Sequence, residues 1–132
     1  ASNDTLDLWE EVKVAGLLAR IQALDSTVLA PTQMLAMATR DAALAVGLSE
    51  VGCLVQGWAA DMIRIDLNYS TFVPITETND LVAHLVWAGS NRRVTDVWVD
   101  GEAVVVDGET TKVDEDQARA EVNNRALRLA QG

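Results

Sequence analysis

Cysteine and histidine are almost absent from this chain, which contains one of each, Cys53 and His84. A single cysteine excludes a disulfide within the chain and is typical of proteins from a reducing compartment. A zinc site takes three or four ligands, mostly histidine and cysteine, so these two residues alone cannot build one. The sequence therefore predicts that this chain holds no metal or other cofactor. We expect Cys53 to pack as a small apolar side chain and His84 to make structural hydrogen bonds rather than act as a base or ligand.

Basic residues are also scarce, since 10 Lys and Arg stand against 20 Asp and Glu and give a net charge of −10. This charge argues against binding to nucleic acid or to an anionic membrane surface, because both are negatively charged themselves. No apolar run approaches the ~20 residues that span a bilayer, and no basic segment followed by an apolar one forms a visible signal peptide. We therefore expect a cytoplasmic protein without nucleic-acid or membrane partners.

The remaining composition is that of a globular protein. At 49% hydrophobic and 23% charged residues, the chain does not have the composition of a disordered segment. A length of 132 residues fits one domain that buries roughly two thirds of its unfolded surface. The first residue is Ala1 rather than methionine, and we interpret the chain as a piece of a longer protein.

The most informative stretch is residues 52–67, GCLVQGWAADMIRIDL. Gly52 and Gly57 precede a compact apolar run, which indicates a turn followed by a strand with one buried face. Asp61 stands at the start of that strand. We expect its carboxylate to brace the turn that contains the two glycines, and we assign structural roles to Gly57 and Asp61.

Helices are predicted from apolar periodicity and from the residues at their ends. Asp7 followed by Glu10 has the spacing of a capping box. Pro31 suits the first position of a helix, and Gly47 is a natural C-terminal stop. The segment between the second helix and the third is expected to hold the strand described above and then a polar loop. The predicted helices cover residues 7–24, 31–46, 80–87 and 114–132, and the loop covers residues 68–78.

The β-rich part of the chain carries two Asp-Gly pairs, Asp100-Gly101 and Asp107-Gly108. Asp-Gly between two β-rich runs is a strong signal for a hairpin, because both residues adopt positive φ readily. Two such pairs in succession predict a meander of three strands, with Gly101 in a structural role at the first turn. The runs are residues 94–99, 103–106 and 110–113.

Four segments, in the same order, resemble the amidohydrolase superfamily. The similarity lies in the branch of S-adenosylhomocysteine and methylthioadenosine deaminases and triazine chlorohydrolases. Residues 52–67 are similar to that family's "GSLEVGKKADLVLID", with Cys53 and Trp58 as departures. The other segments resemble "ASNNxLDMFEE", "MATxxGAxALGL" and "HLVYAASGxxVxxVxVDGxxVVxDG". They are residues 1–11, 37–48 and 84–108.

The resemblance implies an α/β fragment, namely the last helices of a (β/α)8 barrel (a TIM barrel) plus the C-terminal half of the small β-sandwich domain. On this basis residues 1–50 are terminal barrel helices, residues 51–113 are small-domain strands with a short helix, and residues 114–132 are a C-terminal helix. The implied function is that of a C-terminal scaffold segment in a metal-dependent hydrolase. Such an enzyme deaminates or dechlorinates a nitrogen heterocycle.

The resemblance also places the chemistry outside this chain. The metal ligands of that family are histidines and an aspartate on barrel strands, and the aspartate would lie a few residues before Ala1. We therefore expect zinc or iron in the parent enzyme and no activity in this chain alone. Ser2, Asn3 and Asp4 match the loop that approaches substrate in the family, although turn chemistry alone also accounts for them.

The same resemblance implies that Trp9, Val12 and Leu18 face a barrel and that the strands pair with strands from the far N-terminus. Exposed apolar faces and open strand edges usually find a partner. We therefore expect this chain to associate, either with the missing N-terminal part of the parent or with itself. Two alternatives stay open. One is a non-enzymatic oligomerisation module, and the other is a small-ligand binding domain, which requires a closed apolar pocket.

Overall fold

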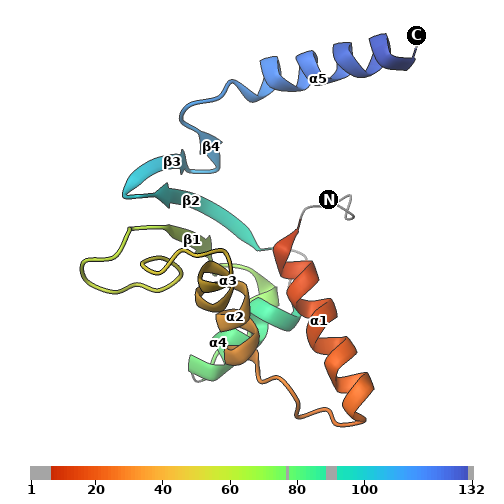
Figure 1. The fold of residues 1–132 in the computed structure, drawn as a ribbon, viewed down its shortest axis with the longest axis vertical. Coiled ribbons are helices and arrows are strands. Elements are labelled where there is room, and N and C mark those ends of the chain that lie inside the picture. The colour runs from red at the N-terminus through yellow and green to blue at the C-terminus, as the bar shows by residue number, and fades with distance from the viewer. Residues whose placement is uncertain (1–6, 77, 89–91, 131–132) are drawn as a thin grey trace.

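The computed structural model of this protein describes residues 7–76, 78–88 and 92–130. Helices begin the described chain, one strand and a second helical segment follow, and three further strands precede the last helix (Figure 1). The strands together form one four-stranded sheet. Within these residues no helix has the length and apolar character needed to cross a membrane. The predicted α/β class is confirmed. The elements are α1 Leu8–Ala23, α2 Pro31–Ala38, α3 Arg40–Ala45, β1 Met62–Asp66, the 3₁₀ turn η1 Ser70–Phe72, α4 Thr78–Ala83, the π-helical turn η2 His84–Ala88, β2 Arg93–Val99, β3 Glu102–Val106, β4 Glu109–Thr110 and α5 Glu115–Ala130.

Helix α1 has the ends that its sequence predicts. The Asp7 carboxylate accepts the backbone N–H of Trp9 at 2.9 Å, so it satisfies one of the amides that the first turn leaves free. Leu24 ends the helix in the left-handed conformation, with φ 52°. The predicted helix over residues 7–24 is confirmed.

The predicted single helix over residues 31–46 is wrong, because the chain breaks at Thr39 into α2 and α3. Thr39 has φ −120° and ψ −93°, and its hydroxyl donates to the Leu35 carbonyl at 2.8 Å. A hydroxyl bonded to the preceding turn competes with regular helix. The backbone of Gly52 also lies against the break, since a Cβ there would stand 2.7 Å from Arg40 Cα. The predicted C-terminal end is confirmed, because α3 ends at Ala45 and Gly47 follows with φ 84°.

The sheet is antiparallel throughout, in the order β1-β2-β3-β4. Asp100 and Gly101 have φ values of 50° and 78°, and Asp107 and Gly108 have values of 51° and 87°. Two successive positive φ values define the tight turn that matches the twist of a hairpin. The predicted meander is confirmed. Its last strand, β4, is shorter than residues 110–113 and begins one residue earlier.

The segment between β1 and β2 contains more regular structure than predicted. The expected loop over residues 68–78 includes the turn η1, whose Phe72 side chain is fully buried. The short helix expected over residues 80–87 is present as α4, and it continues as the π-helical turn η2. This segment therefore packs with α1 and α2 rather than running over the surface, and we call α1, α2, α3, α4 and η2 together the helical layer.

The core of the helical layer consists of Val12, Met34 and Val86. Gly16 permits α1 and α2 to approach closely, because a Cβ at that position would lie 2.3 Å from Met34 Cε. Val12 was expected to face a barrel outside this chain, and that expectation is wrong. Its side chain is 4% exposed and packs inside the layer, because the turn η2 reaches α1 with Val86 and covers it.

The accessible surface of the chain is large for its size. It measures 9680 Å², whereas a compact monomer of 14.2 kDa would expose about 6,800 Å². Part of the excess is apolar. Leu18 is 61% exposed, in agreement with the expectation that its side chain points out of this chain. The other exposed apolar residues of α1 near it are Val14, Leu17 and Ile21.

Candidate functional site

The residues predicted to approach substrate, Ser2, Asn3 and Asp4, lie outside the described residues. The described chain begins at Asp7, immediately before α1. The other predicted positions are all described. Gly57 and Gly101 have φ values of 90° and 78° and occupy turns, while Asp61 and His84 make side-chain hydrogen bonds.

Asp61 joins the start of β1 to the hairpin turn between β2 and β3. Its Oδ1 accepts the backbone N–H of Asp100 at 2.7 Å, and the neighbouring Ala60 carbonyl accepts that of Gly101 at 3.1 Å. The expectation that Asp61 braces the turn containing Gly52 and Gly57 is therefore corrected. The reason is the strand register, because Met62 lies opposite Trp98 and the residue before β1 must meet the residues after β2.

Replacing Asp61 by alanine is expected to lower the free energy of unfolding by about 1–2 kcal/mol, because the Asp100 amide loses its acceptor. Urea titration of the purified chain measures the change. Asp61→Asn is the control, since it keeps an acceptor oxygen at the same place and should retain most of the stability. Equal losses in the two variants, or no loss in either, would contradict this role for the carboxylate.

His84 binds a backbone carbonyl. Its Nε2 lies 2.9 Å from the Pro74 oxygen, so the ring carries a proton on Nε2 and donates it to the carbonyl. His84 is the first residue of η2 and is half-buried. The contact ties the segment after η1 to the helical layer.

Arg92 connects η2 to the beginning of α1. Its Nε donates to the Leu85 carbonyl, and its guanidinium lies 4.9 Å from the centre of the Trp9 ring. Burial lowers the pKa of Arg92 from its ordinary value, and the Asp7 carboxylate opposes this shift. A cation over an aromatic ring is attracted by the ring's electron-rich face. This contact therefore fixes the first turn of α1, which directly follows the predicted substrate loop.

Arg20 makes a matching contact at the other end of α1. Its Nε donates to the Val28 carbonyl at 3.0 Å, and its guanidinium lies 4.2 Å from the centre of the Trp87 ring. Neither Arg–Trp pair is predicted by the sequence. Trp9 lies 83 positions from Arg92 and Arg20 lies 67 positions from Trp87, so local periodicity holds no signal for them.

A buried carboxylate lies within the sheet. Asp96 is 3% exposed, and its Oδ2 lies 2.5 Å from Arg64 Nη2 as an ion pair without the alignment of a hydrogen bond. The hydrogen bond from the Thr95 hydroxyl lowers the pKa of Asp96, and the Arg64 guanidinium lowers it further against the opposing effect of burial. Arg64 also reaches Asp107, at 3.8 Å. The buried charge of Asp96 is thus paired with the guanidinium of Arg64 on the neighbouring strand.

The described residues do not fit a resident metal. Across residues 7–76, 78–88 and 92–130, no group of three or more His, Cys, Asp or Glu side chains is placed to hold one.

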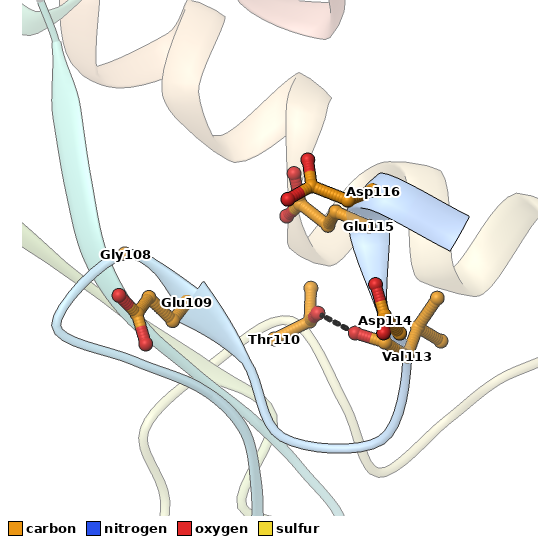
Figure 2. A pocket seen from close by; sticks show the side chains of 7 residues that line it. All are labelled: Gly108, Glu109, Thr110, Val113, Asp114, Glu115 and Asp116. Carbon is orange, nitrogen blue, oxygen red and sulfur yellow. Dashed lines mark hydrogen bonds between the residues drawn. The ribbon is translucent and has the colours of Figure 1, made fainter. Parts of the chain in front are cut away.

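An open hollow of about 330 Å³ lies at the corner between β4 and α5 (Figure 2). The Thr110 hydroxyl donates to the Val113 carbonyl there at 2.6 Å, and Asp114 accepts the Gln117 amide at 2.9 Å as the cap of α5. The hollow is acidic, so it is not the closed apolar pocket that a small-ligand domain requires. Its carboxylates belong to Glu109, Asp114, Glu115 and Asp116.

Comparison with known proteins assigns these elements to a family. The sequence model of the protein family described as "Amidohydrolase family" matches residues 1–104. This chain belongs to the amidohydrolase family. The resemblance to its deaminase and triazine hydrolase branch is confirmed, because the relatives below carry those names.

Three similar proteins illustrate the match. The 5-methylthioadenosine/S-adenosylhomocysteine deaminase of Pelotomaculum thermopropionicum is 39% identical over 129 residues, which cover 98% of this chain and 29% of that protein. The structure of an adenosine deaminase from Xanthomonas campestris with bound zinc matches this chain with a TM-score of 0.90 at 29% identity. The match covers 100% of this chain and 30% of the deaminase chain. The atrazine chlorohydrolase of Arthrobacter aurescens, solved with zinc and atraton, has a TM-score of 0.77 at 24% identity over 88% of this chain and 25% of its own, a likeness of fold alone. This chain therefore spans less than a third of the length of each of these three proteins.

Proposed function

We propose that this chain is the C-terminal part of a metal-dependent amidohydrolase that hydrolytically deaminates, or dechlorinates, a nitrogen heterocycle. The observation that carries the proposal is the 39% identity, over 129 residues, to a deaminase of which this chain matches 29%. Zinc is bound in the structures of both the adenosine deaminase and the atrazine chlorohydrolase. We accordingly propose zinc, with iron as the alternative, for the parent enzyme.

In this proposal the chain is a scaffold. Residues 1–50 contribute the last helices of a (β/α)8 barrel, residues 51–113 contribute strands of the small β-sandwich domain, and residues 114–132 follow as a separate helix. Ser2, Asn3 and Asp4 approach the substrate from the loop before α1. The contact of Arg92 with Trp9 supports this role, because it fixes the helix that follows that loop.

We further propose that the parent works in the cytoplasm and has neither nucleic acid nor membrane as a partner, as the net charge of −10 suggests. The remainder of the parent then covers the exposed apolar residues of α1, which are Val14, Leu17, Leu18 and Ile21.

The alternatives of a non-enzymatic module and a small-ligand domain gain no support from the relatives.

A chimera tests the proposal. This chain would replace the aligned C-terminal segment of the Pelotomaculum deaminase, and the product would be assayed for zinc and for ammonia release from 5-methylthioadenosine and S-adenosylhomocysteine. We expect the chimera to retain zinc and to deaminate at least one of these substrates. The 132-residue chain alone is expected to release no ammonia.

The unmodified deaminase is the positive control for both measurements. A folded chimera that holds zinc but releases no ammonia would contradict the proposed family role of the segment. Stoichiometric metal that stays with the isolated 132-residue chain after dialysis, with ammonia release, would contradict its role as a scaffold without chemistry of its own.

A further inference from the structure

Helix α5 is fully exposed along its length. All sixteen residues from Glu115 to Ala130 are exposed, and the helix extends away from the helical layer (Figure 1). Its ion pairs are internal, with Arg119 bonded to Glu115 at 2.7 Å and Arg125 bonded to Glu121 at 2.8 Å. An isolated helix of this length is marginal in water, because most helical stability in proteins comes from packing of one face. A stably folded α5 therefore needs a surface to pack on.

One face of α5 is suited to packing. Ala118, Val122, Ala126 and Leu129 recur at intervals of four, four and three residues and so form one stripe along the helix. Val122 is 65% exposed and Leu129 is 84% exposed. The two alanines leave room for a second helix to approach closely, and the two larger side chains supply apolar surface.

The charges of α5 are divided between its two ends. Three carboxylates lie in the first half of the helix and a fourth caps its start, whereas two of its three arginines lie in the second half. A second helix of the same sequence complements this pattern only when it runs antiparallel, because a parallel copy sets acidic end beside acidic end. The helix macrodipoles favour the same direction. The carboxylates are Asp114, Glu115, Asp116 and Glu121, and the arginines of the second half are Arg125 and Arg128.

We propose that α5 is a self-association surface on which α5 of a second copy of this chain packs antiparallel about a twofold axis. In this register Ala118 faces Leu129 of the other copy and Val122 faces Ala126, so a small side chain meets a larger one at each level. Glu121 then lies near Arg125 of the other helix, and the symmetric pairing repeats the contact. The family model matches residues 1–104, which end before α5, whereas the Xanthomonas adenosine deaminase structure covers the whole chain. This inference does not depend on the proposed reaction.

Two matched substitutions test which face of α5 forms the contact with the second copy. Val122 and Leu127 are 65% and 59% exposed, but they lie on opposite sides of the helix. Val122→Glu is expected to raise the dissociation constant of the dimer by about tenfold or more, measured by analytical ultracentrifugation of the 132-residue chain, because it places a charge in the apolar contact. Leu127→Glu is expected to leave it within about threefold, and circular dichroism checks that both variants keep α5 helical. A monomer at all concentrations, or equal effects of the two substitutions, would overturn the proposal.

Cross-linking tests the direction and identifies α5 even where another face also associates. In a Cys53→Ser background, Ala118→Cys and Leu129→Cys variants would be oxidised separately and then as a mixture. The antiparallel register predicts a disulfide-linked dimer in the mixture and none from either variant alone, because the two copies of position 118 lie about 16 Å apart along the axis. A linked dimer from Ala118→Cys alone would show parallel packing and overturn the proposal, as would the absence of any link in the mixture.

Discussion

Replacing Gly52 by alanine is expected to lower the free energy of unfolding by about 3 kcal/mol. Gly52 has φ +84°, which an L-residue adopts at a cost of about 1–2 kcal/mol. The new Cβ would also stand 2.7 Å from Arg40 Cα, 2.8 Å from Arg40 N and 2.9 Å from the Thr39 carbonyl carbon. All three are backbone atoms, so the contact is relieved only if the start of α3 moves.

Gly57→Ala is the matched control for this prediction. Gly57 has φ +90°, but no atom lies within 4 Å of a Cβ built on it. The control therefore carries the conformational cost alone, about 1 kcal/mol. Urea titrations followed by circular dichroism give both values, and equal losses at the two glycines would show that the contact between Gly52 and the α2–α3 break does not contribute to stability.

Replacing Met34 by alanine is expected to lower the free energy of unfolding by about 2–5 kcal/mol, since the side chain is fully buried between Val12 and Val86. The size of the loss depends on how far the partly buried side chains that pack on this cluster, Leu29, Ala38 and Trp87, move into the cavity. The same titration measures the loss. A change below about 1 kcal/mol would show that the layer collapses around the missing side chain.

Gly16 provides a second measurement on the same contact. Gly16→Ala in the unaltered chain puts a Cβ 2.3 Å from Met34 Cε and 3.0 Å from Trp87 Cη2, and this overpacking should cost about 1–3 kcal/mol. In the Met34→Ala chain the new methyl group enters emptied space, so its cost should fall by about 1 kcal/mol or more. Strictly additive losses would show that the two positions are not in contact in solution.

The features that the sequence predicted correctly depend on neighbours along the chain. Asp7 caps α1 through an amide two residues away, and Gly47 ends α3 through its own backbone conformation. The Asp-Gly pairs at residues 100 and 107 fix the two hairpin turns in the same way. The family resemblance added what local patterns do not contain, namely that the helices and the sheet belong to one known fold.

The features that the sequence did not predict depend on residues far apart in the chain. The break at Thr39 coincides with the close approach of Gly52, and the partner of Asp61 lies 39 residues away at the end of β2. The contact of Arg92 with Trp9 joins the two ends of the helical segment. Each follows from tertiary packing, which periodicity and end signals along the chain do not encode.

The helices and the sheet described above are joined mainly by the chain itself, because no helix of the described residues packs extensively on a strand. Cooperative unfolding spreads through shared contacts, so we expect the helices and the sheet to unfold as two units of separate stability. Trp9 and Trp87 lie among the helical elements, and Trp98 lies in β2 of the sheet. On this expectation a disturbance at Met34 stays among the helices, while one at Asp61 stays within the strands.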